Sequence, residues 1–147
     1  QMRLQSININ GFRIINDAYN ANPDSVQSAL ELFSDLHANG EKIAVLGDML
    51  ELGEQSDKLH LQIGENIPTN LDLLITVGKL SRQIAKGAEK RISHIISCDS
   101  AKDVVPIIDR YLSDGDIILI KGSRRLKLEQ IVEELQNREP KDKELRT

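Results

Sequence analysis

Apolar and polar positions alternate along the chain with two different periods, and each period predicts one kind of element. Short runs rich in apolar residues, which are typical of strands covered on both faces, occur at residues 43–46, 71–77, 92–96 and 117–120. Between these runs, apolar residues recur every three to four positions, which is the spacing of one buried helix face. Strands that alternate with helices in this way predict right-handed crossovers and a mostly parallel sheet.

The amino-terminal part of the pattern differs, because two strand-like runs follow one another without a helix. The two runs flank Asn10-Gly11, and Asn-Gly in this position is a strong local indication of a hairpin. The sequence therefore predicts an α/β fold: a single doubly wound Rossmann-like domain whose mostly parallel sheet carries an N-terminal antiparallel hairpin. We expect the domain to span residues 1–136, and residues 137–147 to form a polar tail of mixed charge.

Local sequence also predicts where the helices begin and end. Pro23 suits the first position of a helix, and Asn22 before it suits the N-cap, whose side chain accepts from the first turn. We expect this helix to end at Asn39-Gly40, with the glycine in the left-handed conformation, and we expect Ser56 to cap the next helix. Further helices are expected at about residues 81–86, after residue 99 or 100, and over residues 126–135.

Composition limits the kind of core and the kinds of partner. The chain has 147 residues, 39% of them hydrophobic but only 3% aromatic, so we expect a core of Ile, Leu, Val and Ala. The net charge of −4 argues against a nucleic acid or an anionic membrane surface as partner. No run reaches the ~18 apolar residues of a transmembrane span and no signal-peptide pattern opens the chain, so we expect no membrane insertion and a cytoplasmic location. Because the first residue is Gln1, we also expect this chain to be a fragment of a longer protein.

Short polar loops follow the predicted strands, and these loops are where chemistry is expected. In a doubly wound sheet such loops lie together at the carboxyl edge, where ligands bind. Residues far apart in the sequence are therefore expected to converge on one site. The loops comprise residues 17–25, 47–53, 78–81, 97–100 and 121–123.

Two of these loops carry side chains suited to charged ligands. Lys121 offers a cation and Ser123 a hydroxyl to an anion, and Gly122 between them would let a ligand approach the backbone. Asp48 and Glu51 could accept from a substrate ammonium group. Each loop also has a plainer interpretation: a solvated strand end that leads into a helix, and a loop whose acids stay in solvent while its leucines pack.

Other candidate chemistry is weak or missing. His37, His60 and His94 have no second metal-type ligand at a useful spacing, so no metal site is expected, and His60 is expected to be partly exposed on its helix. The single Cys98 excludes an internal disulfide and is expected to be a small buried hydrophobe. The chain has neither a phosphate loop of the Gly-Lys-Ser/Thr type nor a dinucleotide fingerprint after its first strand. Their absence disfavours a self-sufficient ATPase or a standard dinucleotide-binding protein.

Three segments carry a family resemblance. Residues 17–25, 46–53 and 121–124 look like three successive motifs of the C-terminal domain of the Mur ligases, specifically of the MurF type. The order, the spacing and the position of these motifs at strand ends all fit, and the resemblance covers the chain up to about Leu135. The first two motifs are long enough to be specific, and the third adds support mainly by its position.

The resemblance implies a cytoplasmic bacterial ligase of peptidoglycan synthesis, and hence a role in cell wall biogenesis, cell shape and cell division. It implies that ATP phosphorylates the carboxylate of UDP-N-acetylmuramoyl-tripeptide, and that the amine of D-Ala-D-Ala attacks the acyl phosphate. Such ligases have N-terminal, central and C-terminal domains, and the central domain holds the phosphate loop and most contacts to ATP and Mg²⁺. The absence of a phosphate loop here then has a simple explanation, and the fragment alone is expected to be inactive.

The same resemblance assigns roles to individual residues, none of them catalytic on this fragment and none a metal ligand. The residues expected to contact the nucleotide are Asp17, Tyr19, Asn20, Asn22 and Pro23. The residues expected to face the D-Ala-D-Ala substrate are Asp48, Met49, Glu51, Lys121 and Ser123. Among these, Lys121 is the expected partner of the dipeptide carboxylate. Positioning and electrostatics, rather than proton transfer, are the expected contributions of these side chains.

Two alternatives stay open on the sequence alone. A folylpolyglutamate synthase C-terminal domain shares this fold and ligase chemistry, but its corresponding turn is built around Ala-His-Asn-Pro, from which residues 19–23 depart. A non-enzymatic α/β binding module of the receiver type would need an acidic cluster near its first strand. Asp48 resembles the phosphate-accepting aspartate of such a module, but the rest of that pattern is missing.

Overall fold

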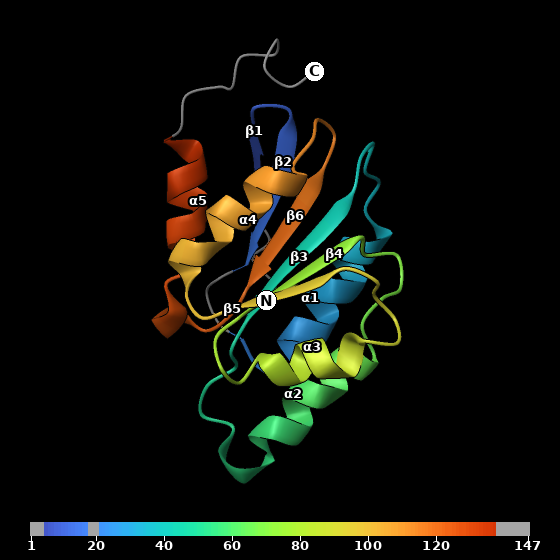
Figure 1. Ribbon diagram of the computed structural model, residues 1–147, viewed down its shortest axis with the longest axis vertical. Coiled ribbons are helices and arrows are strands. Elements are labelled where there is room, and N and C mark those ends of the chain that lie inside the picture. Colours follow the sequence, from blue (N-terminus) through green and yellow to red (C-terminus); the bar gives the residue numbers. More distant parts are fainter. Residues whose placement is uncertain (1–4, 18–20, 138–147) are drawn as a thin grey trace.

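Six strands form the central sheet of the computed structural model, which describes residues 5–17 and 21–137. They are β1 (Gln5–Ile9), β2 (Phe12–Asp17), β3 (Lys42–Gly47), β4 (Leu73–Val77), β5 (Ile95–Cys98) and β6 (Ile117–Lys121). Their order across the sheet is β1-β2-β6-β3-β4-β5 (Figure 1). β1 pairs antiparallel with β2, and all other neighbouring strands are parallel.

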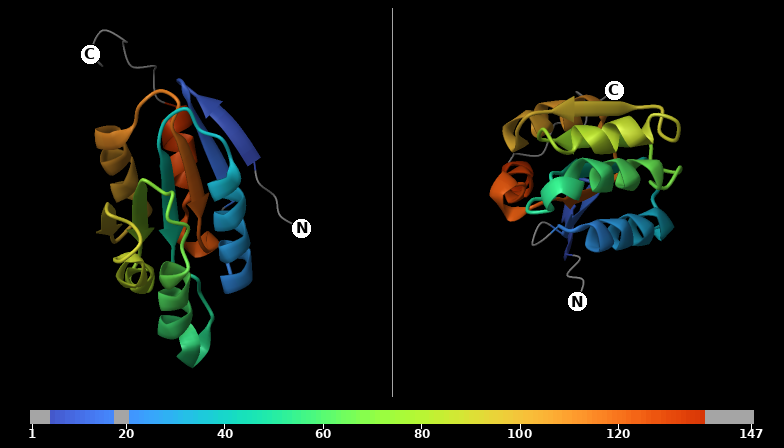
Figure 2. Two further views of the ribbon diagram at one scale, coloured as in Figure 1. Left: turned by 90° about the vertical axis from the view of Figure 1, so that its right-hand side faces the viewer. Right: turned by 90° about the horizontal axis from the view of Figure 1, so that it is seen from below.

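Helices cover both faces of this sheet. They are α1 (Pro23–Asp35), α2 (Ser56–Glu65), α3 (Arg82–Ala88), α4 (Val104–Tyr111) and α5 (Glu129–Gln136). Short 3₁₀ turns lead into three of them, namely η1 (Gly53–Gln55), η2 (Ala101–Asp103) and η3 (Arg124–Leu126). One hydrophobic core packs the sheet against α1, α2 and α3, and the other packs it against α4 and α5. Figure 2 shows α1 and α4 on opposite sides of the sheet.

The predicted α/β fold with its N-terminal antiparallel hairpin is confirmed. Asn10 and Gly11 form the hairpin turn with φ values of 48° and 93°. Positive φ at both central residues is what a two-residue turn of the primed type requires, because its twist matches that of the strands it joins. β2 lies beside β6 in the sheet, so that Asp17 at the end of β2 is next to Lys121 at the end of β6.

The central strands are buried on both faces, which explains their continuous apolar sequence. In β3, Ile43 and Val45 point into the core under α4 and α5, whereas Ala44 and Leu46 point into the core under α1, α2 and α3. All four are at most 1% exposed. Aliphatic side chains make up most of both cores, as the low aromatic content predicts.

α1 begins as the sequence predicts. Asn22 is its N-cap, and the side-chain oxygen of Asn22 accepts from the Ser25 backbone N–H at 2.8 Å. The Ser25 hydroxyl oxygen in turn accepts from the Asn22 backbone N–H at 3.0 Å, which completes a capping box. Pro23 occupies the first helical position, so the turn after β2 leads into a well-defined helix.

The predicted end of α1 is wrong. The helix ends at Asp35, and the following Leu36 is already extended with φ −71° and ψ 142°. Gly40 therefore does not close the helix, and its φ is not positive. Gly40 lies against Asp116 instead, where a side chain would collide with the Asp116 carboxylate and the neighbouring backbone.

Two further local predictions are corrected. Ser56 is the first residue of α2 rather than its cap, because η1 continues directly into the helix. β5 begins at Ile95 rather than at Ile92, and Ile92 is buried in the connection before the strand. α5 ends at Gln136, and all of the predicted polar tail except residue 137 lies outside the described residues, so the domain boundary stays a prediction.

Candidate functional site

Polar contacts join the loops that follow the parallel strands, and the first of them is a buried ion pair. Lys121 Nζ at the end of β6 lies 2.9 Å from Asp17 Oδ2 at the end of β2. The two side chains are only 2% and 7% exposed. Lys121 Nζ also lies 3.5 Å from the Asp17 carbonyl oxygen. The sequence prediction assigns these residues to different ligands, and the structure brings them together.

A second set of contacts joins the loop after β6 to residues 47–53, the loop after β3. The backbone N–H of Ser123 donates to the Asp48 carbonyl oxygen at 3.1 Å. The hydroxyl oxygen of Ser123 accepts from the Leu50 backbone N–H at 3.0 Å. Ser123 therefore holds the first half of the β3 loop through main-chain atoms, and the two loops predicted to face the dipeptide are neighbours.

Asp48 connects the same loop to the next strand end. Asp48 is 7% exposed, and its Oδ1 accepts from the Ser81 backbone N–H after β4 at 2.7 Å. Gly78, also after β4, donates its N–H to the Cys98 carbonyl oxygen at the end of β5 at 2.9 Å. The described parts of the five loops therefore do meet along one edge, as predicted. The plainer interpretation of Asp48 as a solvated acid is wrong.

His60 on α2 supports this loop, a role that the sequence pattern did not reveal. The expectation that it is partly exposed is wrong, because His60 is 0% exposed. Its Nε2 accepts from the Met49 backbone N–H at 2.9 Å, and its Nδ1 lies 2.7 Å from the Ser56 carbonyl oxygen. Since Nε2 accepts and Nδ1 must donate to a carbonyl, these contacts require the neutral ring with the proton on Nδ1. The pattern on α2 alone could not reveal this, because His60 faces a loop rather than the sheet.

Glu51 is the acid of this loop that faces solvent. Its backbone is left-handed with φ 64°, and its side chain is 79% exposed. Arg125 Nη2 lies 3.6 Å from Glu51 Oε1, and the arginine side chain is 77% exposed. An exposed pair at this distance contributes little to stability. The Glu51 carboxylate is therefore held at the surface of the edge, where a ligand cation could reach it.

Gly122 has a packing role that differs from the predicted one. A Cβ at Gly122 would lie 2.5 Å from Leu128 Cδ1 and 3.0 Å from the Gly47 Cα. Gly122 is buried, and Leu128 is 0% exposed. The glycine therefore lets the ends of β6 and β3 approach one another beneath Leu128, rather than opening the backbone to a ligand.

Gly122→Ala is expected to lower the free energy of unfolding by about 2 kcal/mol, because the added methyl overpacks a closed contact. Urea unfolding of the chain measures this loss. Adding Leu128→Ala removes the side chain that the new methyl meets. The double variant should therefore lose less stability than the two single variants lose together. Strict additivity of the two losses would show that Leu128 is not what confines Gly122.

The residues predicted to contact the nucleotide are only partly described. Asn22 is the N-cap of α1 and Pro23 its first residue, and Asp17 is the partner of Lys121. Tyr19 and Asn20 lie outside the described residues. The nucleotide roles of all five stay predictions.

The residues predicted to face the dipeptide lie together, although to different depths. Met49 is 0% exposed and packs in the core under α1, α2 and α3, so any direct contact with a substrate would require it to leave that core. Lys121 is buried, Ser123 is half-buried and Glu51 is exposed. The arrangement can present a carboxylate and a hydroxyl at its surface, while a buried cation lies behind them.

Other chemistry at this edge is limited. Burial, together with the nearby carboxylates of Asp103 and Asp99, raises the pKa of the Cys98 thiol to about 11, so the thiol is protonated at neutral pH. Over residues 5–17 and 21–137, no group of three His, Cys, Asp or Glu residues could hold a metal ion. In the same part of the chain, no helix is both long enough and apolar enough to cross a membrane.

Comparison with known proteins identifies the family. The family described as "Mur ligase, glutamate ligase domain" matches residues 2–124. The chain belongs to the Mur ligase family. The UDP-N-acetylmuramoyl-tripeptide–D-alanyl-D-alanine ligase of Bacillus subtilis (strain 168) is 44% identical over 141 residues, which make up 91% of this chain and 30% of the relative. This Mur ligase domain therefore spans less than a third of the length of that relative.

Two solved structures place the fold in the same family. The MurF ligase from Thermotoga maritima in complex with ADP has a TM-score of 0.76 and 28% identity, and the match covers 91% of this chain and 30% of that one. MurF from Acinetobacter baumannii has a TM-score of 0.79 and 26% identity, with 92% and 30% covered. The predicted resemblance to the C-terminal domain of MurF-type Mur ligases is confirmed. These matches favour it over the folylpolyglutamate synthase and receiver-type alternatives.

Proposed function

We propose that this Mur ligase domain is the C-terminal part of an ATP-dependent, cytoplasmic ligase that joins D-Ala-D-Ala to UDP-N-acetylmuramoyl-tripeptide in peptidoglycan precursor synthesis. The observation that carries the proposal is the bonding of residues 47–53 to residues 121–123 through Ser123, which brings two of the three motifs to one edge. The similarity to a relative named for this ligation supports the same substrates. The partners in the proposal are the N-terminal and central domains of the same protein.

For the incoming dipeptide, we assign charge recognition to the exposed part of this edge. Glu51 accepts from the ammonium group, since its carboxylate is exposed and only loosely paired. The Ser123 hydroxyl oxygen accepts from Leu50, which leaves its own proton for a substrate oxygen. Asp48 and Met49 act by fixing the loop. A dipeptide carboxylate bound to Lys121 would share that ammonium with Asp17.

For the nucleotide, we assign the turn between β2 and α1. The side-chain oxygen of Asn22 is used by the helix cap, so Asn22 has only its amide N–H groups to offer a nucleotide acceptor. Pro23 adds apolar surface, and Asp17, held by Lys121, fixes the start of the turn. Tyr19 and Asn20 complete the predicted set. When bound, ATP supplies the phosphoryl group that activates the tripeptide carboxylate.

We assign Mg²⁺ and the phosphates of ATP mainly to the central domain. The described residues of this chain include no acidic cluster that fits a metal ion. The two buried acids of the edge are already engaged, since Asp17 bonds Lys121 and Asp48 bonds Ser81. The contribution of this domain is therefore to position the dipeptide and the nucleoside, with no proton transfer required of its side chains.

Glu51→Gln in the full-length protein is expected to raise the KM for D-Ala-D-Ala about tenfold and to leave the KM for ATP unchanged. The reason is the loss of one charge-assisted hydrogen bond to the dipeptide ammonium group. Steady-state formation of the ligated product, with each substrate varied in turn, measures both constants. Stability is expected to change little, because Glu51 is exposed.

Glu54→Gln is the matched control, because Glu54 is an exposed acid three positions further along, in η1. It should leave both KM values unchanged. An equal effect of the two substitutions, or none from Glu51→Gln, would remove the loop from the dipeptide site. Absence of ATP-dependent product from the wild-type full-length protein would refute the ligase itself. Robust ATP hydrolysis by the 147-residue chain alone would refute the assignment of ATP to another domain.

A further inference from the structure

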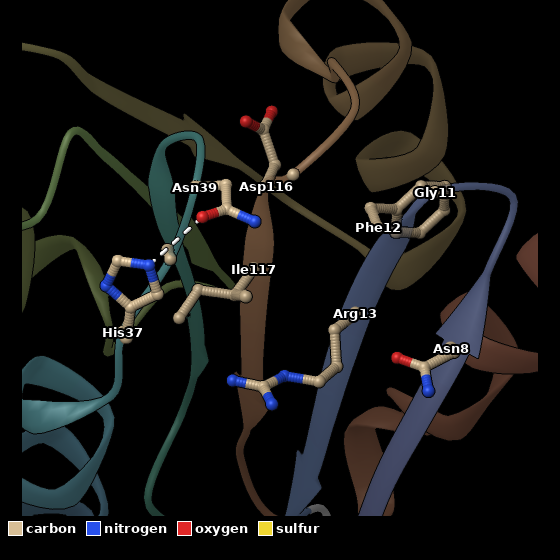
Figure 3. A pocket seen from close by; sticks show the side chains of 10 residues that line it. Asn8, Gly11, Phe12, Arg13, His37, Asn39, Asp116 and Ile117 are labelled. Atoms are coloured by element: carbon tan, nitrogen blue, oxygen red, sulfur yellow. Dashed lines mark hydrogen bonds between the residues drawn. The ribbon is translucent and has the colours of Figure 1, made fainter.

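A pocket of about 410 Å³ opens at the amino edge of the sheet, opposite the edge that carries the strand-end loops (Figure 3). Its apolar lining includes Ile117 at the start of β6 and Ala38 in the connection after α1. Its polar lining includes Arg13 from β2 and the pair His37 and Asn39. Small-molecule sites usually have this construction, with a few polar groups around an apolar surface in a volume of this size.

Arg13 is the feature of this pocket that lacks an explanation within the fold. Its Nε is buried and has no hydrogen-bond partner. No ion pair of Arg13 occurs among the described residues. A guanidinium group has five N–H donors, and leaving a buried one unbonded costs free energy that a bound acceptor would recover.

Two of the side chains that line the pocket already use their acceptor oxygens within the fold. Asp116 is 1% exposed, and its two carboxylate oxygens accept from the backbone N–H groups of Glu41 and Ser113, each at 2.8 Å. The side-chain oxygen of Asn39 lies 3.0 Å from His37 Nε2, which turns the Asn39 amide nitrogen to the other side (Figure 3). Among the described residues, no hydrogen bond uses the Arg13 guanidinium or the Asn39 amide nitrogen, and these donors together with the guanidinium charge favour an anion.

We propose that this pocket binds a small organic carboxylate. The two carboxylate oxygens bond the Arg13 guanidinium, whose planar fork matches them, and the Asn39 amide adds a further donor. The apolar body of the acid lies over Ile117 and Ala38. The proposed ligase reaction uses none of these residues, so this site does not depend on the proposed function.

Titration of the 147-residue chain with sodium benzoate at constant ionic strength tests this proposal, with backbone amide shifts followed by NMR. Saturable shifts are expected at Arg13, Ala38 and Ile117. Benzamide, which has the same shape without the charge, should bind about ten- to a hundredfold more weakly. Arg13→Gln should weaken benzoate binding to a similar extent. Arg82→Gln is the matched control, because Arg82 is exposed on α3 and pairs with Asp99, and it should leave binding unchanged.

Asn39→Asp is a second variant that leaves Arg13 in place. It exchanges an exposed amide donor for a carboxylate at the rim, so benzoate should bind more weakly through repulsion. Three results would each overturn the proposal: no saturable shift at these amides, wild-type affinity in Arg13→Gln, or equal affinity for benzoate and benzamide. Tighter binding of inorganic phosphate than of benzoate would also overturn it, because the pocket would then select a different class of anion.

Discussion

Replacing Lys121 with methionine is expected to lower the free energy of unfolding by about 3–5 kcal/mol. Methionine keeps most of the side-chain volume but removes the ammonium group 2.9 Å from Asp17 Oδ2. Asp17 would then hold a buried charge without its partner, which is the most costly way to break such a pair. Urea unfolding followed by circular dichroism measures the loss.

The double variant Lys121→Met/Asp17→Asn tests whether the ion pair is the cause. It leaves no charge at the site, so much of the lost stability should return. The coupling energy is the difference between the double variant and the sum of the two single variants. Strict additivity of the two losses would show that Lys121 and Asp17 do not interact. Kinetic variants at Lys121 in the full-length protein therefore need a parallel measurement of the folded fraction.

Replacing His60 with alanine is expected to cost about 3 kcal/mol in the free energy of unfolding. The substitution leaves the buried Met49 N–H without an acceptor and opens a cavity beneath the β3 loop. The loop that carries Asp48 and Glu51 would lose its anchor to α2. Chemical denaturation of the chain measures the cost.

Two companion variants separate the hydrogen bond from the packing. His60→Gln places an amide oxygen where it can accept from Met49, so it should recover part of the lost stability. His94→Ala is the matched control, because His94 is exposed, and its effect should stay within about 0.5 kcal/mol. If His60→Gln were as damaging as His60→Ala, the cavity rather than the hydrogen bond would account for the loss.

The elements predicted correctly are those fixed by neighbouring residues. Asn10-Gly11 specifies its hairpin turn, and Asn22 followed by Pro23 specifies the start of α1. Local turn chemistry of this kind acts over a few residues, so a sequence pattern is enough to detect it. The helix end predicted at Gly40 was wrong because a glycine is required there by its close contact with Asp116, and not by a left-handed backbone conformation.

The details of the candidate site depended on contacts between distant parts of the chain. The convergence of the loops followed from the fold class, since parallel strands end at one edge. The pairing of Asp17 with Lys121 did not follow, because the fold class does not show which side chains of two neighbouring loops meet. His60 escaped prediction for a similar reason, since the helix pattern describes the face toward the sheet and says nothing about Met49.

The strand order has a consequence for how the chain reaches this structure. β6 lies between β2 and β3, so the N-terminal hairpin meets the rest of the sheet only through a strand that is made near the end of the chain. Asp17 and Lys121 are 104 positions apart, and closing a loop of that length is a large part of the entropy that folding must overcome. Strands β3, β4 and β5 can pair in the order in which they are synthesised. The hairpin can join the sheet only after β6 has been made. The two ends of the candidate site therefore come together only after almost the whole domain has been synthesised.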